Sequence, residues 1–413
     1  MATTVVHPVV ARTASLAQLI AGIVGPQAKR VLLVSSRGRR EQGEAADYIA
    51  HLLRAARVDV MPWTATAHGE FAPTAQKVCE GVDLVQRFGC DGVVAVGGGT
   101  VIDTAKIVAS ACTNPALLLA MKGAGSPADF MEIMSGRTIS EASLPMFAAP
   151  TLFGAGSEVS ASATVLAEFE SEFFELRSPL LAPRAALIDA SLARSAAAGV
   201  RRTGAITALS HCIAKAVRGG DAADEALRGV SCAAAALRGC SRGGDANDAD
   251  DELIATAAAC GEGGGSSVGG TVGAVVHAVR HQAPVPYAAA TAVALVPMLR
   301  AELQRPRAGD GVGGSDSGGD DADANARRAR YEDVLNALGG GGGDLEGGVA
   351  GALISCVEEL CSGAGAAECT WDTLGVTDEQ LAAAATEAVK SPALLEAALF
   401  DVDVVRDSLA CPQ

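Results

Sequence analysis

The stretch Gly92-Val-Val-Ala-Val-Gly-Gly-Gly-Thr-Val-Ile-Asp-Thr-Ala-Lys106 decides the fold of this chain. Its aliphatic first part, residues 92–96, predicts a buried strand, and residues 101–111 predict a helix. The three glycines between them, Gly97–Gly99, let backbone N–H groups approach a phosphate with no Cβ in the way. The following helix directs its positive end at the same anion. The stretch therefore predicts a dinucleotide phosphate site.

Thr100 and Lys106 are two candidate ligand contacts that follow the glycines. Thr100 is placed to cap the helix or to donate its hydroxyl. Lys106 lies two turns further on, where it reaches a sugar or phosphate or is simply solvated. The turn is neither a Gly-x-Gly-x-x-Gly motif nor a Walker P-loop, so the prediction depends on its strand–turn–helix context.

The flanking sequence alternates predicted strands and helices. The predicted strands are residues 31–34, 58–62, 92–96 and 144–149, and the predicted helices are residues 15–23, 41–56, 73–88 and 101–111. Continuous aliphatic strands alternating with helices indicate a parallel sheet covered on both faces. Residues 1–190 are therefore predicted to form an α/β dinucleotide-binding domain.

The second half of the chain is rich in alanine and predicts helices alone. We expect residues 191–413 to form an all-helical domain, with predicted helices at 191–217, 222–239, 251–260, 268–281, 288–304, 327–338, 346–362 and 376–399. Segments dominated by Gly, Asp and Ser predict flexible surface insertions at residues 241–251, 307–325 and 339–343.

A second loop, Pro150-Thr-Leu-Phe-Gly-Ala-Gly-Ser-Glu158, follows the last predicted strand. Its glycines and hydroxyls suit a second wall around a ligand at the carboxyl edge of the sheet. The structural alternative is a helix N-terminus capped by Ser157, with Glu158 complementing the helix dipole. The two interpretations are compatible.

Composition excludes several partners. The net charge of −16 argues against binding to nucleic acid or to an anionic membrane surface. Residues 1–40 contain no Asp or Glu, a weak feature of mitochondrial or plastid transit peptides, but an ordinary N-terminal helix and a cytoplasmic location are favoured. Eleven cysteines without a Cys-x-x-Cys pair favour free, mostly buried thiols.

Four motifs in order resemble the iron-containing (group III) alcohol dehydrogenase superfamily, which includes glycerol dehydrogenases and maleylacetate reductases. Residues 97–106 resemble its GGGSxxDxAK motif and residues 150–158 its PTTxGTGSE motif. Residues 177–189 resemble the segment before its domain boundary, and Leu209-Ser-His211 with Val276–His281 resembles its helical metal region. The resemblance implies a dehydroquinate synthase-like architecture with the active site between an α/β and a helical domain.

The resemblance also implies cofactor contacts, residue by residue. The pyrophosphate turn would comprise Gly97, Gly98, Gly99, Thr100 and Asp103, while Thr151 and Leu152 would lie against the adenine or nicotinamide end. An acidic residue often follows the family's first strand, on the adenosine ribose. Ser36 stands there in this chain, followed by Arg37, Arg39 and Arg40. Arginines in place of a carboxylate favour a 2′-phosphate, so we expect NADP in preference to NAD.

The implied metal site is incomplete. Family members that bind Fe²⁺ or Zn²⁺ use one Asp and three His; here His211 and His277 match two histidines, and Thr207 stands in place of the Asp. The last histidine falls near Tyr287 or Ala288, neither of which is a good ligand. Because catalytic zinc normally has three strong protein ligands, two imidazoles and a threonine make a poor metal site.

Other polar residues of the family motifs are also missing. Leu152, Ala155 and Ala214 stand where the family has Thr, Thr and Glu. Each replacement removes a polar group from the implied cleft.

Two functions of different classes remain. The first is an NAD(P)-dependent oxidoreductase that reduces a small carbonyl or oxidises an alcohol, with His281 and His277 stabilising or protonating the oxygen. The incomplete ligand set favours a metal-independent, maleylacetate reductase-like reaction, whereas Asp103 is more typical of the alcohol dehydrogenase branch. The alternative is a dinucleotide-binding sensor or structural subunit without turnover. A glycerol-1-phosphate dehydrogenase-like enzyme lacks an evident phosphate pocket, and a homodimer is compatible with either function.

Overall fold

The computed structural model describes residues 9–11, 16–36, 40–66, 72–123, 139–167, 172–193, 196, 198–220, 222–241, 270–303, 320–340, 348–363, 369–390, 405–406 and 409. The chain divides into two compact units. One comprises Met1–Arg201 with Gly261–Gly265, and the other comprises Arg202–Cys260 with Ser266–Gln413. No helix in the described ranges is long and apolar enough to cross a bilayer.

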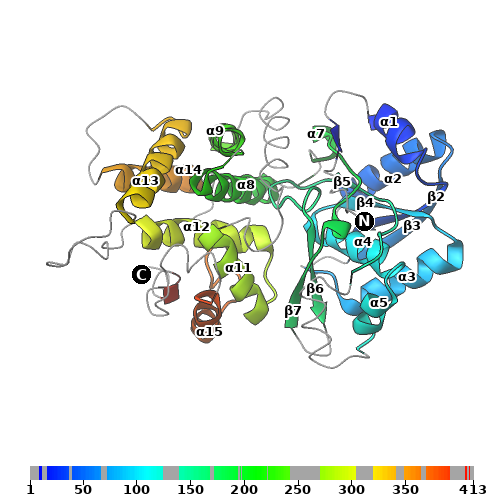
Figure 1. The fold of residues 1–413 in the computed structure, drawn as a ribbon. Helices are drawn as coiled ribbons and strands as arrows, with labels where there is room; N and C mark the ends of the chain where they lie inside the picture. Colours follow the sequence, from blue (N-terminus) through cyan, green and yellow to red (C-terminus); the bar gives the residue numbers. More distant parts are fainter. Residues whose placement is uncertain are drawn as a thin grey trace. The chain divides into compact units, whose positions relative to one another are not determined.

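The first unit is built on a parallel sheet in the strand order β1-β8-β5-β4-β2-β3. Figure 1 labels the strands β2, β3, β4 and β5 of this sheet. Its strands are β1 (Val9–Ala11), β2 (Arg30–Ser36), β3 (Asp59–Thr66), β4 (Gly92–Gly97), β5 (Met146–Pro150) and β8 (Ala185–Leu187). The helical segments are α1 (Leu16–Leu19), η1 (Ile20–Val24), α2 (Arg40–Ala55), α3 (Ala75–Phe88), α4 (Gly99–Ala111), α5 (Pro115–Met121), η2 (Pro179–Leu181) and α7 (Ala190–Ala193). The predicted α/β domain is confirmed.

Both faces of the sheet are buried, as the aliphatic strands predict. Because side chains alternate along a strand, Leu32 and Val34 of β2 join one core with α3 and α4. Val31 and Leu33 point to the opposite face and join a second core with η1 and α2. All six residues of β4 are buried, so this strand lies at the centre of the unit.

The strand order places the loops that follow β2 and β4 at a topological switch point. The chain runs from β2 outward to its neighbour β3, returns to β4 on the other side of β2, and then continues to β5. In the parallel register Ser35 of β2 lies opposite Val96 of β4, so Ser36 and Gly97 follow at the same carboxyl edge. Ligands of open α/β sheets bind in the crevice at such a point.

A two-stranded antiparallel hairpin, β6 (Ser162–Ala167) and β7 (Glu172–Arg177), was not predicted from the sequence. A parallel bridge between Thr74 and Leu166 and a hydrogen bond from Leu166 N to Pro73 O (2.7 Å) connect β6 to the start of α3. Two sequence expectations need correction. The helix after the glycines begins at Gly99, not at residue 101, and residues 151–161 form turns rather than a helix capped by Ser157.

The second unit is helical in its described part (Figure 1). Its helices are α8 (Ala198–Arg218), α9 (Ala223–Ser241), α11 (Gly270–Gln282), α12 (Tyr287–Leu303), α13 (Asp320–Ala337), α14 (Gly348–Gly363) and α15 (Asp378–Ala388). Small and aliphatic side chains from all of them form one core. The predicted helical second half is confirmed, but α13 begins at Asp320, within the segment 307–325 predicted as an insertion. The predicted helix at 251–260 lies outside the described residues, as do 242–250, 307–319 and 341–343 of the predicted insertions.

Most described cysteines are free thiols, with one exception. Cys79, Cys90, Cys112, Cys232, Cys356, Cys361 and Cys369 are free. Cys212, which is fully buried in α8 beside His211, is disulfide-bonded, and its partner lies outside the described side chains. The expectation of free thiols is therefore wrong at this position.

Candidate functional site

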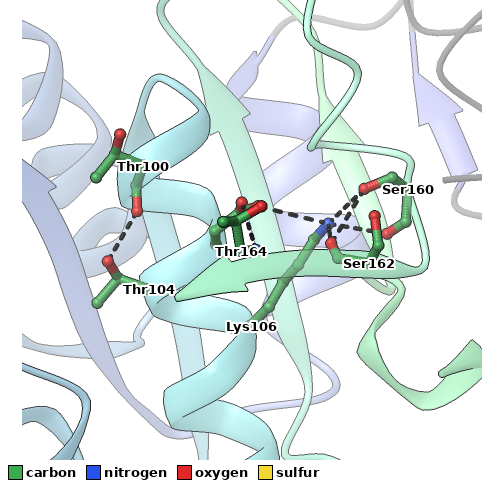
Figure 2. A network of polar contacts seen from close by, with 7 residues as sticks. Thr100, Thr104, Lys106, Ser160, Ser162 and Thr164 are labelled. Atoms are coloured by element: carbon green, nitrogen blue, oxygen red, sulfur yellow. Dashed lines mark hydrogen bonds and ion pairs between the residues drawn. The ribbon is translucent and has the colours of Figure 1, made fainter. Parts of the chain in front are cut away.

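The glycine turn joins the central strand β4 to α4. Gly98 is the N-cap of α4, and no side chain caps the helix. Thr100 is therefore not the cap that the sequence suggested; its carbonyl accepts a hydrogen bond from the Thr104 hydroxyl (2.7 Å) (Figure 2). Because the first N–H groups of a helix have no acceptor within it, the start of α4 retains backbone donors. Such donors fit an anionic group.

Glycine is required in this turn for packing as well as for backbone access. A Cβ at Gly98 would lie 2.8 Å from Leu152 Cδ1, and one at Gly97 would lie 2.7 Å from the Cβ of Val101. A Cβ at Gly99 would lie 3.2 Å from Ser157 Oγ. The glycines therefore allow the 150–158 loop to pack directly onto the turn.

The glycine turn, residues 97–99, and the 150–158 loop contact each other at the carboxyl edge of the sheet. Thr151 N donates to Gly97 O at 3.0 Å, and the side chain of Leu152 packs over Gly98. The Thr151 hydroxyl is buried and has no hydrogen-bond partner among the described residues. A buried hydroxyl without a partner is costly, so this oxygen is available to a ligand at the turn.

Lys106 has a different role from the one that the sequence suggested. Its side chain is fully buried, and Nζ donates to Ser160 O (2.9 Å), Ser160 Oγ (2.8 Å) and Ser162 O (2.8 Å) (Figure 2). Because an ammonium group has three hydrogens, these acceptors use all of them. Burial lowers the pKa of Lys106 to about 8, against the opposing effect of the Asp103 and Glu158 carboxylates. Lys106 is thus neither solvated nor directed at a phosphate; it fixes the start of β6 to α4.

Asp103 belongs to the same network. Its Oδ2 accepts a hydrogen bond from Thr164 N (3.1 Å), and its Oδ1 lies 4.0 Å from Lys106 Nζ. One turn of α4 therefore holds two successive parts of the 160–164 segment. Through these contacts Asp103 stabilises the glycine turn at the start of α4.

Glu158 is a buried acidic residue whose only role predicted from the residues was to complement a helix dipole. It is 2% exposed, and its Oε1 has no hydrogen-bond partner among the described residues. Burial raises the pKa of this carboxyl, against the lowering effect of the Lys106 ammonium. The sequence places it in a motif, but its burial depends on the fold of the 150–161 turns.

Ser36 ends β2 beside the switch point, and its side chain is half-buried. Its position is therefore compatible with the ribose role that the sequence suggested. Arg37 and Arg39 lie outside the described residues, as does the side chain of Arg40 at the start of α2.

The histidines of the second unit form a cluster with a tyrosine. His211 of α8 is buried, and its Nε2 lies 3.0 Å from the Tyr287 hydroxyl. The ring of Tyr287 lies 5.4 Å from that of His277 on α11 and 5.9 Å from that of His211, measured between centroids. The buried Arg280 guanidinium lies 5.8 Å from the centroid of the tyrosine ring. Residues of α8 and α11 thus contact Tyr287 at the start of α12.

This cluster does not fit a metal ion. A metal-binding imidazole directs a nitrogen lone pair at the ion, which is about 2.0–2.1 Å away for zinc. In this structure His211 Nε2 is instead hydrogen-bonded to the Tyr287 hydroxyl. Thr207, in the place of the family's aspartate, donates its hydroxyl to Thr203 O at 2.7 Å within its own helix. The described residues contain no group of three or more His, Cys, Asp or Glu placed to hold a metal.

His281 pairs with an acidic residue that sequence reasoning missed. Its Nδ1 is in close contact with Oε1 of Glu387 on α15, and the two side chains are 32% and 37% exposed. Gln282 Nε2 lies 3.5 Å from the other Glu387 oxygen. Such a partner orients an imidazole and fixes its tautomer. The two residues are 106 positions apart, so no local pattern reveals the pair.

The family model of iron-containing alcohol dehydrogenases matches residues 8–190. The probable alcohol dehydrogenase EutG of Escherichia coli K12 is 33% identical over 141 residues, which cover 34% of this chain and 33% of that protein. Lactaldehyde reductase of the same strain is 29% identical over 232 residues, 55% of this chain and 57% of that protein. The chain thus matches about a third to about half of the length of these relatives.

Solved structures support the same assignment at the level of the fold. An archaeal alcohol dehydrogenase from a Red Sea brine pool, ADH/D1, aligns with a TM-score of 0.75 and 18% identity over 98% of this chain and 97% of that one. Butanol dehydrogenase A of Thermotoga maritima aligns with a TM-score of 0.73 and 18% identity over 99% and 97%. The family match thus covers residues 8–190, and the solved alcohol and butanol dehydrogenases share the fold of the whole chain.

Proposed function

We propose that this protein is a nicotinamide-dependent oxidoreductase that interconverts a small alcohol and the corresponding carbonyl compound without a bound metal. The observation that supports the proposal is the switch point of the parallel sheet. The start of α4, the buried Thr151 hydroxyl and Ser36 all lie at the carboxyl edge of the sheet there. The relatives' names support the reaction class: EutG is described as a probable alcohol dehydrogenase, and another relative as lactaldehyde reductase.

Different residues of this chain would bind the dinucleotide and supply the proton. The start of α4 with Gly97–Gly99 would bind the pyrophosphate, and Leu152, which covers Gly98, would support the dinucleotide against the sheet edge. When bound, the nicotinamide supplies or accepts a hydride. In the reducing direction the carbonyl carbon would gain that hydride, and its π pair would move to the carbonyl oxygen. His281, oriented by Glu387, delivers the proton that completes the alcohol.

The same proposal includes a preference for NADP over NAD. Ser36 carries no charge to repel a 2′-phosphate at the end of β2, and Arg37, Arg39 and Arg40 follow it in sequence. We expect NADPH to bind at least about tenfold more tightly than NADH, as one to two charge-assisted hydrogen bonds allow. Equal dissociation constants in parallel fluorescence titrations would contradict the preference.

The phosphate site is tested by Gly98→Ala. The new Cβ would displace Leu152, so we expect NADPH affinity to fall about tenfold or more as the turn shifts. Gly199→Ala is a suitable control because a Cβ there meets nothing within 4 Å. Undiminished NADPH affinity in Gly98→Ala would remove this turn from the cofactor site.

A second candidate is a dinucleotide-binding protein without turnover, acting as a sensor or structural subunit. The observation that favours it is the bond between His211 and Tyr287, which closes the family's metal position. NADPH oxidation against a panel of small aldehydes and ketones separates the two. Tight NADPH binding without oxidation across the panel would favour the second candidate.

A further inference from the structure

Two neighbouring glycines at the start of α4 face different side chains. A Cβ placed on Gly98 would lie 2.8 Å from Leu152 Cδ1, so an apolar side chain covers this residue. A Cβ placed on Gly99 would lie 3.2 Å from Ser157 Oγ and 4.0 Å from the Cβ of Ala155. Ser157 therefore brings a hydroxyl to the Gly99 side of the helix start, whereas Leu152 covers the Gly98 side.

The first backbone N–H groups of α4 are available to an anion. The first hydrogen bond of the helix runs from Ile102 N to Gly98 O at 3.1 Å. The N–H groups of Gly99, Thr100 and Val101 precede it and have no acceptor in the part of the chain that the structure describes. Because the helix dipole places positive charge at this end, these donors stabilise an anion beside Gly99.

Two side-chain hydroxyls beside the glycine turn are also unused within the described residues. No side chain caps α4, and the half-buried Ser157 hydroxyl has no hydrogen-bond partner in the described ranges. The Thr151 hydroxyl, which is 2% exposed, also lacks a partner there, and Thr151 N is bonded to Gly97 O at 3.0 Å. Because a buried polar group without a partner is costly, a ligand that accepts hydrogen bonds here is favoured.

We propose that Ser157 is a phosphate-binding residue: its hydroxyl donates a hydrogen bond to a pyrophosphate oxygen of the dinucleotide, beside the N–H groups of Gly99 and Thr100. This role rests on the proposed function, and it adds a side-chain donor to the backbone donors of α4. A hydrogen bond to a charged oxygen is stronger than one to a neutral acceptor. A hydroxyl introduced at Ala155, which lies beside the same glycine, would reach the same region.

The first test measures the dissociation constants for NADPH and NADH by fluorescence titration. Ser157→Ala removes the donor, so we expect the dissociation constant of the tighter-binding nucleotide to rise about tenfold. Ser140→Ala is the matched control, because it removes an exposed serine hydroxyl of the same unit. Ser140 N is bonded to Asn114, which follows the opposite, C-terminal end of α4. An unchanged dissociation constant in Ser157→Ala would overturn the role of Ser157.

The second test separates a contact with phosphate from an effect on the loop structure. The double variant Ala155→Thr/Ser157→Ala restores a hydroxyl beside Gly99 from a different position, so we expect most of the lost affinity to return. Thermal unfolding verifies that each variant folds. If the double variant binds no more tightly than Ser157→Ala, Ser157 acts through the loop structure, and the proposal is overturned.

The two proposals fail in distinguishable ways. Wild-type protein that binds neither nucleotide would contradict the proposed function. Wild-type protein that binds a nucleotide no more tightly than Ser157→Ala does would contradict only the role of Ser157.

Discussion

Two polar clusters carry the sequence motifs of the superfamily, and they have diverged to different extents. In the first unit, Lys106 and Asp103 of α4 form hydrogen bonds with the backbone of β6 and of the turn before it. In the second unit, His211 keeps its motif position but bonds to Tyr287 instead of contributing to a metal site. The difference shows that the two sets of motif residues have different roles in this structure: the first joins α4 to the segment that leads into β6, whereas the second contacts Tyr287.

The largest expected effect comes from breaking the first cluster with Lys106→Met. Three buried acceptors would lose their donor and Asp103 would lose its neighbouring charge, so we expect the first unit to lose about 3 to 5 kcal/mol of unfolding free energy. In a Trp371→Phe background Trp63 is the only tryptophan, so urea unfolding followed by its fluorescence reports on this unit.

The control for that measurement is Lys122→Met, at an exposed lysine on the same unit, which should change stability by less than about 0.5 kcal/mol. Lys106→Met unfolding at the wild-type urea concentration would show that the buried network contributes nothing to the fold. The two clusters would then not differ in the way argued above.

Much of the first unit could be predicted from sequence because its signals are local. The aliphatic run at Gly92–Val96 and the three glycines after it identify a strand, a turn and a helix within one stretch. The role of Lys106 could not be predicted, since its acceptors at Ser160 and Ser162 belong to a hairpin that no periodicity indicates. A lysine near a glycine turn has the same sequence signature whether it faces a phosphate or the protein interior.

For the candidate site in the helical unit, the sequence predicts which residues belong to the site but not which partners they contact. The motifs identify His211, His277 and His281, and the missing ligand near Tyr287. The partners are set by long-range packing: Tyr287 is 76 residues from His211, and Glu387 is 106 residues from His281. Helix contacts at such separations decide whether an imidazole is free to bind a metal or is held by a neighbour.

An intermediate effect is expected from Glu387→Gln, which sharpens the second half of the comparison. If His281 relays the proton, loss of its carboxylate partner should lower kcat about tenfold while leaving the dissociation constant for NADPH unchanged. The pH profile of kcat should also shift, and Glu387→Asp should recover part of the rate. Glu379→Gln, at an exposed position in the first turn of the same helix, is the control. An unchanged profile would assign Glu387 to helix packing alone.

The smallest effect is expected from Glu158→Gln, and its sign depends on pH. Burial raises the pKa of Glu158 above the value of 4.5 of an unperturbed glutamate. As pH rises past that value, the unfolded chain releases its proton first, so the wild type loses stability until the pH passes the folded pKa. The amide does not titrate. The variant should therefore gain stability relative to the wild type as the pH rises above about 4.5, where the unfolded wild-type chain ionises.

Urea unfolding at several pH values measures this difference, with Glu141→Gln at an exposed position as the control. A flat difference across the range would mean that Glu158 is ionised in the folded protein and compensated by the Lys106 ammonium. In that case the first cluster would extend to Glu158 as a charged pair. A rising difference instead limits the cluster to Lys106, Asp103 and the 160–164 segment, and leaves the Glu158 carboxyl protonated beside the turn.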